Sequence, residues 1–155
     1  MALVVFDVSG TLHDDFVGAP MYDGLMDVFK KLQQNDIQIA LATNLSRQGV
    51  EHFIQTNGLE GFISESMTMS EAPPKPHPKM LEDVILKTGE NAKETLMVGD
   101  SSGDIAMAKA CKVASVAVCW NGAWRPEILA QSPDYKVDKI DNLWQIFSEF
   151  FKIEK

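Results

Sequence analysis

Four short groups of polar residues stand out in this 155-residue chain, because each follows an apolar run or sits in a stiff loop. The groups are Asp7-Val8-Ser9-Gly10-Thr11, Thr43-Asn44, Lys75, and Gly99-Asp100-Ser101-Ser102-Gly103-Asp104. A carboxylate can attack phosphorus and form an acyl phosphate. Hard divalent cations prefer oxygen ligands, and a lysine adds a second positive charge. These residue types indicate phosphoryl transfer, which depends mostly on positioning and charge neutralisation.

The residue types divide into a metal set and a phosphate set. Asp7 and Asp100 can share a Mg²⁺ ion, with the backbone carbonyl of Ser9 and water molecules completing an octahedron. Lys75 can place its charge on phosphate oxygens and on the nucleophile, while the Thr43 hydroxyl and nearby N–H groups bind the remaining oxygens. One aspartate after a strand would carry little weight, but all four groups in this order favour a single site.

The segments between the groups alternate between strand and helix patterns. Apolar runs typical of strands covered on both faces are 3–6, 37–42, 95–98 and 115–118, with a further strand around 62–63. Helical periodicity covers about 22–34, 46–58, 78–89, 103–110 and 143–150. The alternation predicts an α/β fold, a doubly wound three-layer sandwich with a mainly parallel sheet and one domain over residues 1–155. Sites in such folds lie at the carboxyl ends of the strands.

Lys75 is held by its own sequence surroundings. The stretch Ala72–Pro78 contains four of the seven prolines in the chain. Proline is excluded from helix interiors and from central strands. The stretch is therefore predicted to form a stiff loop that fixes the lysine in place.

Composition and charge exclude several classes of protein. The chain has 14 basic and 22 acidic residues, a net charge of −8, so we expect no nucleic-acid partner. No apolar run approaches the roughly 18 residues of a membrane span, and no secretory signal pattern is seen. Cys111 and Cys119 form no zinc or redox pair. We therefore expect a cytoplasmic protein with reduced thiols and no membrane partner. We also expect the three histidines to lie at the surface.

The four groups resemble the motifs of the haloacid dehalogenase superfamily of hydrolases. The stretches that most resemble its phosphoglycolate phosphatase-like branch are Lys75-Pro76-His77-Pro78, Gly99 to Asp104, and Asn121-Gly122-Ala123-Trp124. The resemblance spans nearly the whole chain, from about Leu3 to Leu143. It is specific for the superfamily and weak for the substrate.

The resemblance implies a role for each matching residue. Asp7 would be the nucleophile that carries an aspartyl phosphate, and it would ligate Mg²⁺ together with Asp100 and the backbone carbonyl of Ser9. Asp104 would contact the metal directly or through another group. Thr43 and Lys75 would act in catalysis by holding the phosphate. The full phosphate-binding set would be Gly10, Thr11, Thr43, Asn44 and Lys75.

Ser9 is the first departure from the family pattern. Most phosphatases of the superfamily have an aspartate at this position, which protonates the leaving oxygen and later deprotonates the hydrolytic water. Such general acid–base help is typically worth about 10²–10⁴-fold, and a serine hydroxyl has no pKa near neutrality. Three outcomes stay open: a slow phosphatase, a different reaction on the same nucleophile, or a protein without turnover. Asp14 or Asp15 is a less favoured substitute acid.

The second departure is the lack of a cap domain at either usual insertion point. Closing lids exclude water and select substrates, so we expect an open site. An open site suits a phosphorylated small molecule or a bulky phosphorylated substrate, or a homo-oligomer in which a second copy covers the site. Two roles are open for Trp120 and Trp124, with Met67 or Met69: to line the rim of the site or to pack at an interface.

The leading hypothesis is a Mg²⁺-dependent phosphomonoester hydrolase that acts through an aspartyl phosphate on Asp7 and is slow because of Ser9. The alternative is a catalytically impaired relative that binds phosphate or metal and acts as a regulatory or scaffold protein. Dehalogenation or phosphonate cleavage is a weaker third reading, since phosphonate-cleaving relatives use a lysine from a cap.

Overall fold

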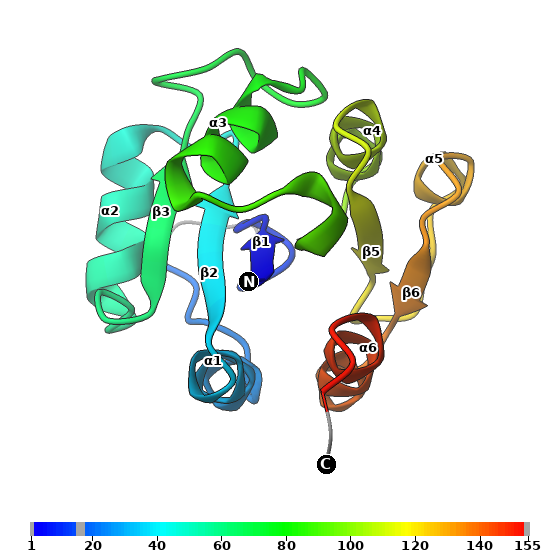
Figure 1. Ribbon diagram of the computed structural model, residues 1–155, viewed down its shortest axis with the longest axis horizontal. Coiled ribbons are helices and arrows are strands. Elements are labelled where there is room, and N and C mark those ends of the chain that lie inside the picture. The colour runs from blue at the N-terminus through cyan, green and yellow to red at the C-terminus, as the bar shows by residue number, and fades with distance from the viewer. Residues whose placement is uncertain (1, 15–17, 154–155) are drawn as a thin grey trace.

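The computed structural model describes residues 2–14 and 18–153, which contain one sheet of six parallel strands flanked by helices (Figure 1). In sheet order the strands are β3 (Ile63–Met67), β2 (Ile37–Ala42), β1 (Ala2–Phe6), β4 (Thr95–Gly99), β5 (Ala114–Val118) and β6 (Tyr135–Val137). The α-helices are α1 (Leu25–Gln34), α2 (Arg47–Thr56), α3 (Lys79–Thr88), α4 (Ser102–Ala110), α5 (Pro126–Leu129) and α6 (Leu143–Phe150). Two short 3₁₀ helices are η1 (Ala92–Glu94) and η2 (Ile140–Asn142). The strand order runs outward from β1 in both directions, which confirms the doubly wound fold.

Alternating residues of β1 divide the core into two layers. Val4 and Phe6 pack with the buried faces of α1, α2 and α6, while Leu3 and Val5 pack with those of α3 and α4. Figure 1 shows α1 and α6 on one side of the sheet and α3 and α4 on the other. Because both faces of the central strands are covered, their sequences are continuously apolar.

The structure shifts several predicted boundaries. The first helix begins at Leu25 rather than near residue 22, because Gly24 precedes it in a left-handed conformation with φ of 94°. Strand β3 lies at the sheet edge and runs further than expected, to Met67. The sequence patterns did not predict β6 or α5, which are only three and four residues long. No helix in the described ranges has the length and apolar character that a bilayer crossing requires.

Strand register brings three of the polar groups together at the carboxyl ends of the strands. Phe6 pairs with Leu41 of β2 on one side and with Val98 of β4 on the other. The residues that follow these three strands therefore lie level with one another, and the backbone N–H of Asp7 donates to the Val98 carbonyl at 2.9 Å. The predicted crevice at the carboxyl ends of the strands is where these groups meet.

Candidate active site

Asp7 lies directly after β1, and its carboxylate is held from two sides. The residue is only 6% exposed. Thr11 Oγ1 donates to Asp7 Oδ2 at 3.3 Å, and Lys75 Nζ donates to Asp7 Oδ1 at 2.7 Å. A charge-assisted hydrogen bond to a buried carboxylate fixes its orientation. Asp7 is therefore a fixed carboxylate at the point where the strands end.

Lys75 connects two carboxylates that are far apart in the sequence. Its Nζ lies 2.7 Å from Asp7 Oδ1 and 2.6 Å from Asp104 Oδ1, and its side chain is only 5% exposed. Its backbone N–H donates to Asn44 Oδ1 at 2.9 Å. This bond ties the proline-rich loop to the residue after β2, so the loop places the lysine as expected.

Asp104 serves the site and helix α4 at the same time. Ser101 caps the helix, with its hydroxyl accepting from the Asp104 N–H and donating to Asp104 Oδ2 at 2.9 Å. Because Oδ2 also accepts from the Ser101 N–H, the pair forms a capping box. The other oxygen, Oδ1, contacts Lys75. The helix terminus thereby holds a fully buried carboxylate toward the lysine.

Three carboxylates converge beside the lysine and form a donor set that fits a divalent cation. One oxygen from each of Asp7, Asp100 and Asp104 lies within 4.8 Å of the others. A Cβ on Gly10 would overlap the Asp100 carboxylate, and one on Gly99 would overlap Asp104, so both glycines leave room for the cluster. Oxygen donors of this type are the ligands that Mg²⁺ prefers.

The cluster carries more negative charge than one lysine neutralises. Burial raises the pKa of Asp7 to about 6, against the opposing charge of Lys75. Burial, together with the charge of Asp7, raises the pKa of Asp104 to about 6. Burial also raises the pKa of Asp100. Burial alone would lower the pKa of Lys75, but Asp104 and Asp7 outweigh it and raise that pKa above its ordinary value. A site with this imbalance favours a bound cation or a proton.

The remaining residues of the predicted site have different surroundings. Thr43 is buried at the end of β2, where its hydroxyl accepts from the Leu45 N–H at 3.1 Å. Asn44 joins the site through the backbone of Lys75. Ser9 forms a bridge with His13 and lines a separate cavity of about 270 Å³. The structure therefore links Asn44 to the lysine by a hydrogen bond and shows no comparable contact for Thr43 or Ser9 among the described residues.

The prediction that the histidines lie at the surface is wrong for His13. Its ring is buried against Phe53, with 4.8 Å between ring centroids, and Nδ1 lies 3.1 Å from the Ala19 carbonyl oxygen. The reason is that the backbone of His13 forms isolated β-bridges with both Ser9 and Met21, so the chain after β1 folds back over this side chain.

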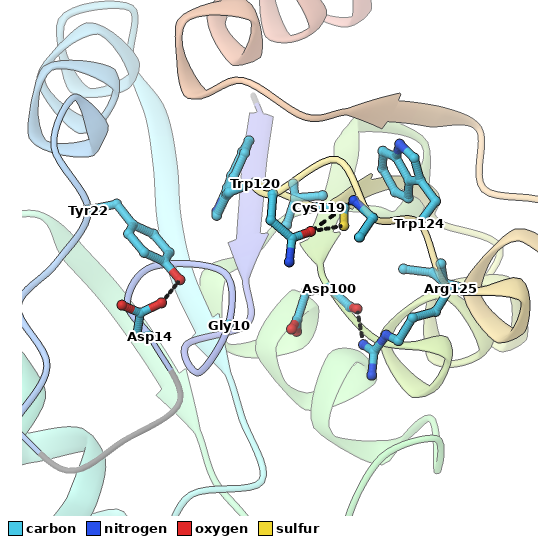
Figure 2. A pocket seen from close by; sticks show the side chains of 12 residues that line it. Gly10, Asp14, Tyr22, Asp100, Cys119, Trp120, Trp124 and Arg125 are labelled. Carbon is cyan, nitrogen blue, oxygen red and sulfur yellow. Dashed lines mark hydrogen bonds between the residues drawn. The ribbon is translucent and has the colours of Figure 1, made fainter.

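A second pocket adjoins the carboxylate cluster, and Figure 2 shows its labelled lining residues. Trp120 and Trp124 line it, whereas Met67 is buried and Met69 is exposed outside it. The site hypothesis had not included Tyr22 or Arg125. Arg125 directly follows the Asn-Gly-Ala-Trp stretch, so its position in the sequence could have indicated a place near the site. No spacing pattern in the sequence indicates that Tyr22 lies there.

Comparison with known proteins places this geometry in a family. The family model for haloacid dehalogenase-like hydrolases matches residues 5–118. The pyrophosphatase PpaX of Bacillus mycoides is 31% identical over 137 residues, covering 88% of this chain and 63% of the relative. The chain thus spans less than two thirds of the length of that protein.

Solved structures show the same fold. A haloacid dehalogenase phosphatase from Thermococcus onnurineus superposes with a TM-score of 0.82 at 17% identity, covering 95% of this chain and 98% of that one. A predicted phosphoglycolate phosphatase from Haemophilus somnus gives 0.76 at 24% identity, covering 84% of this chain and 58% of that one. The chain belongs to the haloacid dehalogenase-like hydrolase family, and the resemblance inferred from its motifs is confirmed.

Proposed function

We propose that this chain is a Mg²⁺-dependent phosphomonoester hydrolase that forms an aspartyl phosphate on Asp7. The observation that carries the proposal is the contact of Lys75 Nζ with both Asp7 and Asp104, beside a cluster that includes Asp100. Family membership and a relative named as a pyrophosphatase support hydrolysis of a phosphate compound. Inorganic pyrophosphate therefore belongs among the substrates to be tested.

The residues of the chain divide the first step between them. A carboxylate oxygen of Asp7 attacks phosphorus, and the bond between phosphorus and the leaving oxygen breaks. Thr11 and Lys75 hold the Asp7 carboxylate in place through their hydrogen bonds. Mg²⁺, held by Asp7, Asp100 and Asp104 with the Ser9 carbonyl, would neutralise charge on the phosphoryl group. Gly10, Thr43 and Asn44 complete the proposed phosphate-binding set.

The second step also needs proton transfer, which the Ser9 hydroxyl does not provide. Water attacks the phosphorus of the aspartyl phosphate, the bond from phosphorus to Asp7 breaks, and inorganic phosphate leaves. The Ser9 hydroxyl is neither an acid nor a base near pH 7, so the leaving oxygen in the first step and the water in the second exchange protons with solvent. The less favoured substitutes are Asp14, which lines the pocket next to Gly10 and Asp100, and Asp15, which lies outside the described residues. We therefore propose slow turnover with phosphate retained on Asp7.

Mass spectrometry after an acid quench tests this proposal directly. The protein is incubated with Mg²⁺ and acetyl phosphate, p-nitrophenyl phosphate or pyrophosphate, then quenched and digested. We expect one phosphoryl group on the peptide containing Asp7, and none in Asp7→Asn. Asp83→Asn, which changes an aspartate paired with Lys79 on α3, is the matched control and keeps the modification. Absence of both phosphorylation and turnover with every donor would refute the hydrolase.

Ser9 also motivates a second candidate: a phosphate- or metal-binding relative that regulates or tethers a partner without turnover. It predicts Mg²⁺ binding without phosphorylation of Asp7 by any donor.

Assembly of two copies over the open site is a separate prediction, which multi-angle light scattering checks by measuring the mass in solution.

A further inference from the structure

The pocket beside the carboxylate cluster has the position expected of a leaving-group site. It has a volume of about 450 Å³, within the range typical of small-molecule pockets, and Gly10 and Asp100 form part of its wall. Figure 2 shows Tyr22 and Asp14 on one side of these two residues and Arg125 on the other. A phosphoryl group bound at Asp7 and Asp100 would therefore leave the rest of its ester beside this pocket.

Two aromatic rings of the pocket are anchored through their only polar hydrogens. Trp120 Nε1 donates to the Thr11 carbonyl at 2.9 Å, and the Tyr22 hydroxyl donates to Asp14 Oδ1 at 2.8 Å. An indole has one N–H and a phenol one O–H, so neither ring has a further proton to donate to a ligand. What these side chains offer a ligand is mainly ring surface, already fixed in position before binding.

The opposite part of the pocket adds a third ring and one cation. Arg125 Nη2 donates to the Asp100 backbone carbonyl at 2.8 Å, which holds the guanidinium beside the proposed metal ligand. The other N–H groups of an arginine side chain can bind an acceptor or stack on a ring. Trp124 is stacked against Lys136, whose Nζ lies 5.9 Å from the centre of the indole.

We propose that this pocket binds the leaving group of the substrate and selects a planar aromatic one, as in a nucleotide or an aryl phosphate. The inference rests on the proposed phosphatase function. The ring stacks against Tyr22 and Trp120, and a polar edge of the ring faces Arg125. Either kind of leaving group can use the polar lining residues Asp14, Asn121 and Arg125, but only a planar ring also uses the ring faces of Tyr22 and Trp120, whose O–H and N–H protons are already donated within the protein.

Binding measured without turnover tests the selectivity. Isothermal titration of Asp7→Asn in Mg²⁺ compares phenyl phosphate and adenosine 5′-monophosphate with glycerol 3-phosphate and ribose 5-phosphate. We expect the two ring compounds to bind about tenfold more tightly or better, the gain typical of a base stacked on an aromatic side chain. Should Asp7→Asn fail to fold, the ratio of kcat/KM values for the same compounds in the wild type replaces it.

Variants of Tyr22 separate the ring from its hydroxyl. Tyr22→Leu should remove most of the preference for ring compounds while glycerol 3-phosphate binds as before, and Tyr22→Phe should keep the preference. Trp120→Leu should act like Tyr22→Leu, and Trp144→Leu on α6 is a control outside the pocket. Loss of affinity for all four compounds alike in Tyr22→Leu would mean a structural role and would overturn the assignment.

The outcomes distinguish this inference from the proposed function. If acetyl phosphate phosphorylates Asp7 but ring compounds bind no better than glycerol 3-phosphate, the selectivity is overturned and the phosphatase stands. If ring compounds bind more tightly through Tyr22 while no donor phosphorylates Asp7 and none is turned over, the pocket's selectivity is supported and the hydrolase function falls.

Discussion

Ser9 is the residue to which we attribute the proposed slow turnover. It occupies the position at which most phosphatases of the superfamily carry a carboxylate, and in this structure it lines a different cavity from that of Asp100. Asp7, Lys75 and the acidic cluster lie together without it. Under the proposed mechanism, the missing group is therefore the one that would transfer protons, not one that would bind or attack.

Replacing Ser9 with aspartate places a carboxylate at the position that the family resemblance assigns to proton transfer. We expect Ser9→Asp to raise the rate of dephosphorylation by about 10²-fold or more, because general acid–base catalysis is typically worth 10²–10⁴-fold. Quenched-flow decay of the aspartyl phosphate measures this rate. Ser9→Asn is the matched control, with similar shape and no ionisable group, and should give no gain. An equal rate in both variants would show that the proton step does not limit turnover.

The buried carboxylates link metal binding to pH. Asp7 and Asp104 have pKa values raised to about 6, so below that pH they hold protons that a metal must displace. In the metal-free protein these protons favour the folded state, and that contribution is lost as the pH rises from about 4 through 6. Added Mg²⁺ should therefore stabilise the protein increasingly across the same range.

Thermal unfolding with and without Mg²⁺ measures this linkage. We expect a rise in Tm of several degrees at pH 7.5, as saturating ligand is worth about 2.7 kcal/mol at 100 times Kd. The rise in Tm should nearly vanish at pH 5. Below the pKa of a ligand carboxylate, each proton that Mg²⁺ must displace lowers the Mg²⁺ affinity about tenfold per pH unit. Asp83→Asn removes a carboxylate that pairs with Lys79 on α3, outside the acidic cluster, and should leave this pattern unchanged. A Mg²⁺ effect independent of pH would contradict the assignment.

At the scale of elements, helix α4 joins local stability to the chemistry of the site. Its capping box uses Asp104, and the same side chain contacts Lys75 through its other oxygen. Helix α2 has a simpler cap, in which the Ser46 hydroxyl accepts from the Gly49 N–H at 3.1 Å. The two helices therefore provide a matched pair of N-cap serines, one connected to the site and one apart from it.

Removing each cap separates these two effects. Ser101→Ala and Ser46→Ala should each cost about 1 kcal/mol of unfolding free energy in urea, the typical loss for an N-cap. Only Ser101→Ala should also weaken Mg²⁺ binding, by severalfold in isothermal titration, because it frees the Asp104 carboxylate to rotate. Equal Mg²⁺ affinities in the two variants would show that Lys75 alone positions Asp104.

The loop before α3 depends on its neighbour α2. Arg47 donates to the Ser66 hydroxyl at 2.6 Å and pairs with Glu71, which in turn accepts from the Thr68 hydroxyl at 2.9 Å. These bonds connect the first residue of α2 to the end of β3 and to the loop that follows. They hold the loop upstream of the prolines, and the hydrogen bond from the Lys75 N–H to Asn44 holds it at the lysine itself.

At the scale of the whole molecule, the aromatic core supports β1, the strand that directly precedes Asp7. Phe6 precedes Asp7, and its ring lies between those of Phe29 on α1 and Phe147 on α6, at centroid distances of 5.2 and 6.1 Å. All three side chains are fully buried. Packing between layers thus fixes the height and direction at which β1 presents Asp7.

Truncating this core should destabilise the entire fold. Phe147→Ala is expected to lower the unfolding free energy by about 3–5 kcal/mol, the usual loss for a buried phenylalanine. Phe150→Ala on the same helix removes a partly buried ring and should cost clearly less. Urea denaturation monitored by circular dichroism measures both. Equal losses would mean that α6 is held mainly by its outer ring.

The sequence by itself determined the class of fold and most of the site. Continuous apolar runs alternating with helical patterns predicted the parallel sheet, because strands covered on both faces require such runs. Polar residues directly after those strands predicted Asp7, Asp100 and Asp104 at one edge, and the prolines around Lys75 predicted its stiff loop. The very short elements β6 and α5 escaped prediction because three or four residues carry too little periodicity.

Only the tertiary structure decided which side chains touch. Three findings depend on segments that are distant in the chain. Lys75 contacts both Asp7 and Asp104, and His13 is buried. Tyr22 shares a pocket with Trp120. Local patterns record the burial and period of each element, but not the path of the loops that bring separate elements together. The sequence thus predicted the candidate catalytic residues, and packing decided which side chains each of them contacts.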